Sequence, residues 1–363
     1  EKARVSLARK AYDLSMDVQH STGGGYRDRT ESQQVNAILS GGFDITPLLG
    51  TDFDIGYTFN EYQLPGGLSE AAYQSDPSQA GNPDDDTSSH ELRSQFHTEW
   101  LSSDLFTLEA AGSYRYKWQK TDQPSFLSYE NRTYHIGEGG LKARFNEPYA
   151  HVPWQLITGI EGTAMQLEVD SYSSEDRTGT PDTAEVGRIS GAAYLKADAS
   201  LSEKLSLDGG LRYDAARFSA KDYTGLDDAT FHQVLVYDAG LVWNPSKNSK
   251  LGLRSGSIFR YPFTDEQADT NFSHTFNSDL KPEYGWNLEL NGAYLEREFL
   301  ELKAGAYALY MLDEIALMGG SNTNIDPTLR VGGDAEVRFT PIEWLSLGGI
   351  YNYVDARFAA GQY

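Results

Sequence analysis

The residue types that most often carry enzyme chemistry are missing from this sequence or scattered along it. The chain has 363 residues and no cysteine, which excludes disulfide scaffolds, thiolate zinc sites and cysteine nucleophiles. It contains neither a G-x-S-x-G turn nor a phosphate-binding loop. Its histidines show no zinc-ligand spacing, and we expect a protein that is not an enzyme. They are His20, His90, His97, His135, His151, His232 and His274.

One acidic run could bind a metal. Asp84, Asp85 and Asp86 follow one another in a polar stretch, and clustered carboxylates on a loop suit Ca²⁺. A solvated acidic loop tip explains the same run more simply. The chain has 30 Lys and Arg against 53 Asp and Glu, a net charge of −23, which disfavours nucleic acid as a partner.

The elements that would position these groups are predicted to be β-strands. Phe106, Leu108 and Ala110 begin one apolar face of a segment whose intervening positions are mostly polar, and this alternation indicates a strand. No apolar run approaches the roughly 18 residues of a membrane helix. The alternation recurs at residues 34–45, 205–216, 300–313 and 331–339.

Two kinds of connection alternate between these strands, short turns and long polar loops. We count about sixteen strands joined as hairpins. A propeller would need four short strands per repeat, whereas each repeat here holds two strands, many of about 10 to 16 residues. The pattern predicts an all-β protein, an antiparallel up-and-down transmembrane β-barrel with aromatic residues at both membrane interfaces. The longer loops are expected at residues 23–30, 64–86, 122–129, 173–184, 221–229, 261–283 and 318–329.

The most informative stretch is Ser257–Tyr294, which carries two proline-containing elements. Pro262 and Pro282 cannot donate to a β ladder, so they suit the points where two strands leave the sheet. Lys281 and Glu283 are expected to fix the base of the intervening loop by ion pairing. We predict a structural role for these elements, which consist of Phe259, Arg260 and Pro262, then Leu280, Lys281, Pro282 and Glu283.

These elements resemble the F-R-A-P and N-P-x-L-K-P-E motifs of TonB-dependent outer-membrane receptors. Gly25-Tyr26-Arg27, Leu64-Pro65-Gly66 and Pro341–Phe358 are also similar to that family, in the family's order. The resemblance implies a twenty-two-stranded barrel with a plug domain and a TonB box. Since about sixteen strands are present, we expect residues 1–363 to be an incomplete barrel domain, without plug or terminal strands.

The resemblance also implies a function, namely ligand-gated uptake through the outer membrane of a Gram-negative type of cell. The expected substrate is a scarce small molecule, most often a ferric siderophore, with haem, cobalamin or a sugar as alternatives. The implied partners are membrane lipid, lipopolysaccharide and the TonB complex, which acts through the plug. No resident cofactor is expected. His274, between the two motif elements, is a weak candidate for contacting haem iron.

Two alternatives stay open. Sixteen strands in this length would make a complete passive diffusion porin, although the motif and the lack of an obvious inward constriction loop argue against one. A barrel enzyme would need a close Asp–His or Ser–His pair at the rim. We expect the wall charges to hydrate the lumen or to contact the plug; they are Arg93, Glu109, Arg115, Lys117, Lys142, Arg144, Lys196, Arg212, Glu289, Lys303 and Arg338.

Overall fold

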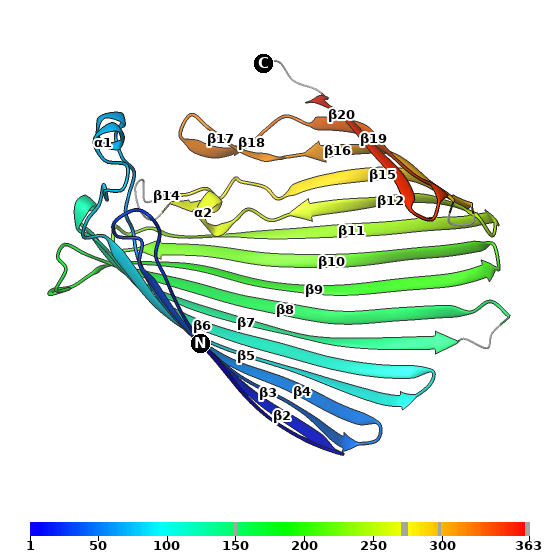
Figure 1. The fold of residues 1–363 in the computed structure, drawn as a ribbon, viewed down its shortest axis with the longest axis horizontal. Helices are drawn as coiled ribbons and strands as arrows, with labels where there is room; N and C mark the ends of the chain where they lie inside the picture. The colour runs from blue at the N-terminus through cyan, green and yellow to red at the C-terminus, as the bar shows by residue number, and fades with distance from the viewer. Residues whose placement is uncertain (148–150, 270–274, 297–298, 360–363) are drawn as a thin grey trace.

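Sixteen strands form one antiparallel sheet in a computed structural model that describes residues 1–147, 151–269, 275–296 and 299–359. Each strand pairs with the one before it in the large sheet, so the predicted hairpin order is confirmed (Figure 1). The strands are β1 (Lys2–Arg9), β2 (Tyr12–Gly23), β3 (Ser32–Thr46), β4 (Leu49–Gln63), β5 (Asp86–Ser103), β6 (Phe106–Gln123), β7 (Ser128–Glu147), β8 (Trp154–Tyr172), β9 (Asp182–Ser202), β10 (Leu205–Asp222), β11 (Asp227–Ser246), β12 (Ser249–Arg260), β15 (Glu283–Glu296), β16 (Leu300–Leu312), β19 (Thr328–Ile342) and β20 (Leu345–Phe358).

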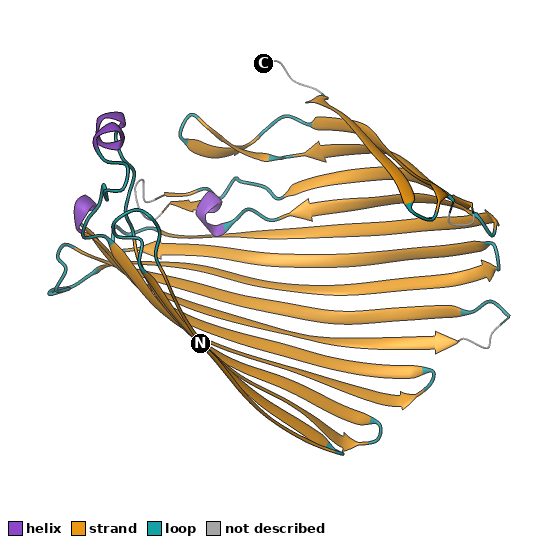
Figure 2. Cartoon of the chain, in the orientation of Figure 1, coloured by secondary structure: helices purple, strands orange, loops and turns teal. Residues whose placement is uncertain are grey.

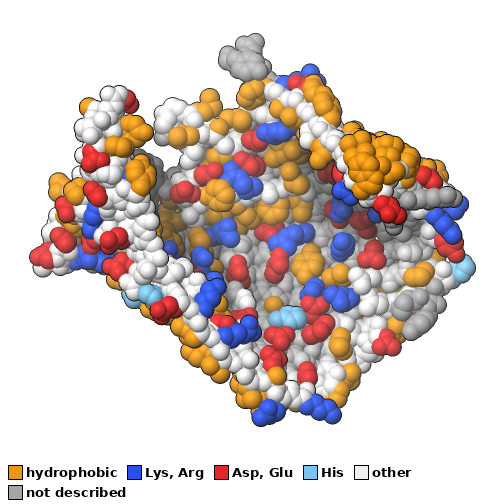
Figure 3. Space-filling model, in the orientation of Figure 1, with side chains coloured by type: hydrophobic (Ala, Val, Ile, Leu, Met, Phe, Trp, Pro, Cys, Tyr) orange, Lys and Arg blue, Asp and Glu red, His pale blue; other side chains and the backbone are white. Residues whose placement is uncertain are grey.

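The sheet curls, and its two faces differ in chemistry as the alternation predicts. Residues opposite each other in register share a face, so Leu92 and Tyr116 lie together on the convex face. The next position on each strand, Arg93 and Arg115, lies on the concave face. Figure 3 shows this concave face as a hollow lined by charged side chains.

Aromatic side chains stack at both ends of the convex face. At the short-turn end the ring centroids of Phe106 and Phe145 are 4.9 Å apart, and those of Trp100 and Phe106 are 6.3 Å apart. At the long-loop end His90 packs between Phe59 and Trp118, at 5.0 and 5.8 Å. The structure thus has the two aromatic bands that the sequence predicts.

The long connections gather at one end of the sheet, and several contain short elements (Figure 2). The connection after β4 contains α1 (Glu70–Ser75), and that after β6 contains η1 (Pro124–Phe126). The connection after β12 holds α2 (Thr264–Gln267), β13 (Ala268–Asp269) and β14 (Thr275–Phe276). Elements this short leave no periodic signal in a sequence.

The expected loop at residues 318–329 is misplaced. The chain leaves the large sheet after β16, and a separate hairpin of β17 (Ile315–Met318) and β18 (Ser321–Asn324) occupies the connection. Alternation alone does not mark this exit, because β17 continues the apolar character of β16. Asp313 has a φ of 55°, and this left-handed residue turns the chain out of the sheet.

β1 and β20 are the two edge strands of the sheet, and they do not pair with each other in the described residues. The helices of the described chain are all too short and too polar to cross a membrane.

Candidate functional site

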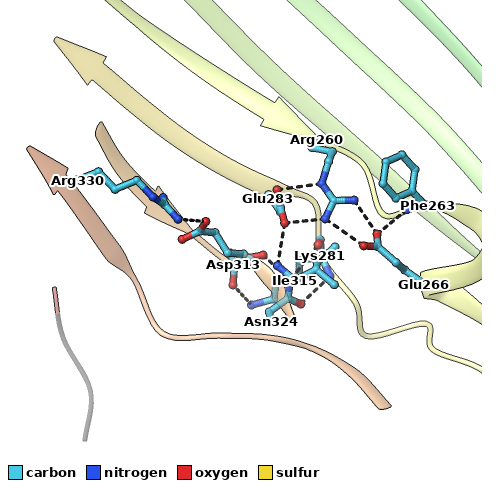
Figure 4. A network of polar contacts seen from close by, with 10 residues as sticks. Arg260, Phe263, Glu266, Lys281, Glu283, Asp313, Ile315, Asn324 and Arg330 are labelled. Atoms are coloured by element: carbon cyan, nitrogen blue, oxygen red, sulfur yellow. Dashed lines mark hydrogen bonds and ion pairs between the residues drawn. The ribbon is translucent and has the colours of Figure 1, made fainter. Parts of the chain in front are cut away.

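The base of the loop between β12 and β15 is held by ion pairs around one arginine. Arg260 and Glu283 are opposite in register, and the guanidinium donates to both carboxylate oxygens, at 3.0 and 2.7 Å. It also donates to both oxygens of Glu266 in α2, at 2.7 and 3.2 Å (Figure 4). We call Arg260, Glu266 and Glu283 the loop-base network. Such bidentate pairs fix both distance and orientation.

Both carboxylates of this network also bind backbone groups. Glu266 accepts from the Phe263 N–H at 2.7 Å, which closes the first turn of α2. Glu283 accepts from the Ile315 N–H at 2.9 Å, which ties the start of the β17–β18 hairpin to the sheet. The Arg260 guanidinium lies 4.7 Å from the ring centroid of Phe263. Arg260 thus joins α2 to the start of β15, and Glu283 extends the connection to the β17–β18 hairpin.

Asn324 also holds the base of this loop, through hydrogen bonds to the backbone of Lys281 and Asp313. Its amide oxygen accepts from the Lys281 N–H at 2.8 Å, and its amide nitrogen donates to the carbonyls of Lys281 and Asp313 at 3.0 and 2.7 Å. The Lys281 ammonium lies 3.7 Å from the Asp313 carboxylate. Leu280 and Pro262 are fully buried, so both motif elements are packed at this base.

The described parts of the loop at residues 261–283, which are 261–269 and 275–283, pack inward against the concave face. The Tyr261 hydroxyl donates to Asp214 on β10 at 2.8 Å, and Ala268 packs with Val186 and Ala220, which project from the concave face of β9 and β10. An inward constriction loop is not obvious in the sequence, but this loop does turn inward. The sequence does not reveal this inward course, because the loop carries its apolar residues at spacings that match no regular strand or helix. Burial, reinforced by the hydrogen bond to Asp214, raises the pKa of Tyr261.

The acidic run lies at the same end of the sheet, and its three members differ. Asp85 is fully buried and accepts hydrogen bonds from the Asn82 amide at 2.8 Å and the Ser125 N–H at 3.2 Å. Asp84 is exposed, and Asp86 begins β5. No group of three or more possible metal ligands occurs in the described part of the chain. Calcium binding at Asp84, Asp85 and Asp86 remains a prediction, as does the role of His274, which lies outside the described residues.

Arg27 joins two of the sequence segments that resemble the receptor family. Its guanidinium donates to the backbone carbonyls of Pro65 at 3.3 Å, Gly66 at 2.9 Å and Gln79 at 3.2 Å. No pattern in the sequence pairs the two segments with each other. Their joint resemblance to one family was the only signal of this contact.

The concave wall carries a second charged centre, near the short turns. Glu109 on β6 lies 2.5 Å from the Lys142 ammonium and 3.1 Å from the Arg144 guanidinium, both on β7, and 3.6 Å from His97 on β5. We call these four residues the wall network. It borders a hollow of about 790 Å³ that also contains Arg212 and Asp214. In the described residues no histidine forms a hydrogen bond with an aspartate or a serine.

The comparisons with known proteins agree with this architecture. Residues 17–363 match the family described as TonB dependent receptor-like, beta-barrel. The chain belongs to this family. A sequence comparison with curated proteins finds no match.

Solved structures share the fold of this TonB-dependent receptor barrel. The ferric citrate transporter FecA superposes with a TM-score of 0.75 at 14% identity, over 97% of this chain and 56% of FecA. The ferric-catecholate import receptor Fiu from E. coli K12 superposes with a TM-score of 0.74 at 14% identity, over 100% of this chain and 64% of Fiu. The alcaligin receptor FauA from Bordetella pertussis superposes with a TM-score of 0.72 at 14% identity, over 99% of this chain and 59% of FauA. The chain thus spans less than two thirds of each neighbour's length.

Proposed function

We propose that this chain is the barrel of a ligand-gated transporter in the outer membrane of a Gram-negative type of cell. The observation that carries the proposal is the family match over residues 17–363. The polar, hollowed concave face would be the lumen, and the apolar convex face would contact lipid and lipopolysaccharide. Uptake would be energised by TonB through a plug domain in the complete receptor.

The proposed substrate class is a ferric siderophore. FecA, Fiu and FauA are named as a ferric citrate transporter, a ferric-catecholate import receptor and an alcaligin receptor. In this chain the loop-base network would keep the loop at residues 261–283 folded over the lumen wall, so that its side chains meet the substrate in a fixed arrangement. A rigid loop base lowers the entropy lost when a ligand binds.

A passive sixteen-stranded porin accounts less well for the structure. A complete barrel of that kind pairs its first and last strands, whereas β1 and β20 are edge strands that do not pair with each other in the described sheet. We propose that these edges pair with further strands in the complete receptor. A porin would share the number of strands, the polar concave face and an inward loop, but not the open edges.

Deleting the intact gene tests the function. We expect the deletion strain to grow poorly under iron limitation on one iron source and normally on others, and complementation to fail when TonB is absent. A porin predicts instead a general, TonB-independent loss of small-solute entry. Normal growth on every ferric siderophore and on haem would contradict iron uptake. A defect confined to haem would direct the next experiment to His274→Ala.

A further inference from the structure

Three arginines without an ion pair in the described residues share one register row across the concave face of the sheet. The row begins at Arg4 and Asp17, which pair with each other, and reaches Arg93 through Ile38 and Gly56. Arg93 on β5 lies directly opposite Arg115 on β6, and Arg115 lies opposite Ile136 on β7. The row continues through Met165 on β8 to Arg188 on β9. We call Arg93, Arg115 and Arg188 the arginine row. Neighbouring strands are about 4.8 Å apart, so Arg115 and Arg188 are roughly 14 Å apart across the apolar pair.

The arginine row lacks the ion pairs that other arginines of this face make. In the described part of the chain no carboxylate lies within 4.0 Å of Arg93, Arg115 or Arg188, although acidic residues outnumber basic ones. The other arginines on the concave side of the strands each have a carboxylate within that distance. They are Arg4, Arg132, Arg144, Arg212, Arg254, Arg260, Arg330 and Arg338.

This arrangement costs stability unless something else meets the charges. Like charges directly opposite on neighbouring strands repel each other, as Arg93 and Arg115 must. The Nε atom of Arg188 is buried and has no hydrogen-bond partner. Among the described residues, all the remaining arginines on the concave side of the strands pair with a carboxylate, whereas these three do not.

The carboxylates nearest in register do not neutralise the arginine row. Asp54 accepts hydrogen bonds from Ser40 and from Gln95, the latter at 2.8 Å, and Glu138 accepts from Ser113 at 3.2 Å. Glu91 lies opposite Lys117, whose ammonium is 5.7 Å from the centroid of the Tyr134 ring. The donors of the arginine row therefore remain available to an anion from the lumen.

We infer that the arginine row binds the anionic groups of the transported ligand, which is therefore a negatively charged metal chelate. This inference rests on the proposed uptake function and names its substrate class. Arginine presents paired donors to carboxylates and other planar anions. Ile136 and Met165 lie between the cations, so the chelate would set its less polar body on them and its charged groups on the arginines at either side, Arg93 with Arg115 and Arg188.

The test measures binding of ⁵⁵Fe chelates of different charge to the purified full-length receptor. The probes are ferric citrate and ferric enterobactin, which are anionic, ferrichrome, which is neutral, and ferrioxamine B, which is cationic. We expect wild type to bind an anionic probe, and Arg93→Gln/Arg115→Gln to weaken that binding at least about 10-fold, since two charge-assisted contacts are lost. The Lys/Lys double variant should retain part of the affinity.

Arg217→Gln is the matched control. Arg217 also lacks an ion pair in the described structure, but it lies opposite Ile189 and Phe231 on the convex face. We expect its chelate affinity to equal that of wild type. Because the Gln/Gln variant removes a repulsion, its urea midpoint should not fall, which separates lost binding from lost folding.

Three results would overturn the inference. Binding confined to the neutral or cationic probe, or an anionic probe bound equally by wild type and the Gln/Gln variant, overturns it while leaving uptake intact. Unchanged chelate affinity with faster proteolysis of the plug domain would assign the arginine row to an acidic plug segment instead. A wild-type receptor that binds none of the four probes overturns the proposed iron uptake and this inference together.

Discussion

The loop-base network and the wall network are both built from arginine and carboxylate, but they are organised oppositely. In the loop-base network one guanidinium, Arg260, serves two carboxylates that come from a helix and a strand separated by a long loop. In the wall network one carboxylate, Glu109, serves the cations Lys142 and Arg144 of the adjacent strand β7 and lies beside His97 of β5. The first therefore carries excess negative charge and the second excess positive charge.

The difference shows what each network stabilises. The strands around Glu109 are already fixed by their β ladders, so the wall network mainly balances charge in the lumen. The strands that carry Arg260 and Glu283, β12 and β15, are also joined by a ladder, but α2 and the β17–β18 hairpin lie outside the large sheet. The loop-base network therefore mainly holds these two elements against the sheet. Removing the central residue should consequently affect loop order in one case and barrel stability in the other.

The largest effect is expected from Arg260→Gln. Two carboxylates would face each other without their cation, and the loop anchor should weaken by about 2 kcal/mol, a change of roughly 30-fold in the open population. Limited proteolysis between residues 264 and 280 should accelerate by that factor, while the barrel keeps its heat-dependent shift on gels.

Arg338→Gln is the control for that change. Arg338 pairs with Glu301 at 3.4 Å, is largely exposed and lies near the short-turn end of β19, away from the long loops. Loop proteolysis in this variant should match wild type. If the loop of Arg260→Gln resisted proteolysis as well as that of wild type, Arg260 would not be an anchor of the loop.

Glu109→Gln should have the opposite profile. It leaves Lys142 and Arg144 adjacent without a carboxylate, and we expect about 1 kcal/mol lower barrel stability, read from the urea midpoint, with unchanged loop proteolysis. The combined Arg260→Gln/Glu109→Gln variant should show the sum of the two single effects, since the sites share no contact. A synergistic loss would mean that the two networks are coupled.

Asn324→Ala should weaken the anchoring of the loop base by slightly less than about 1 kcal/mol. The variant loses neutral hydrogen bonds to Lys281 and to the Asp313 carbonyl, but the ion pairs of Arg260 remain. Hydrogen exchange at the Lys281 amide should accelerate several-fold. Unchanged exchange there would show that the ion pairs alone hold the base.

The smallest of these predicted effects concerns Tyr261, and it depends on pH. Its raised pKa, caused first by burial, means that folding favours the neutral phenol. The associated stability is complete below the ordinary tyrosine pKa of about 10 and is lost as pH rises towards the folded-state value. Loop proteolysis should therefore accelerate above about pH 10 in wild type and less so in Tyr261→Phe. An identical alkaline response in both proteins would exclude Tyr261 as the cause.

The sequence predicts the strands well because their signal is local. Alternation over a strand such as β6 assigns Glu109 and Arg115 to one face without any knowledge of the neighbours. The motif likewise predicts ion pairing at Glu283, but it does not identify Arg260 as the partner.

Non-local facts could not be obtained in the same way. Arg93, Arg115 and Arg188 share a row only because of strand register, and a shift of one residue in any pairing would separate them. The partnership of Arg260 with Glu266 depends on the path of an irregular loop. The inward course of that loop depends on scattered apolar contacts such as that of Ala268.

The β17–β18 hairpin has a practical consequence for spectroscopy. Met318 at its tip is 58% exposed, and the following Gly319 and Gly320 have positive φ and open space around them. Because the chain contains no cysteine, Met318→Cys would create a single thiol in this barrel for a spin or fluorescent label. Since Glu283 binds the Ile315 N–H at the foot of this hairpin, the label would report directly when the anchored loops move.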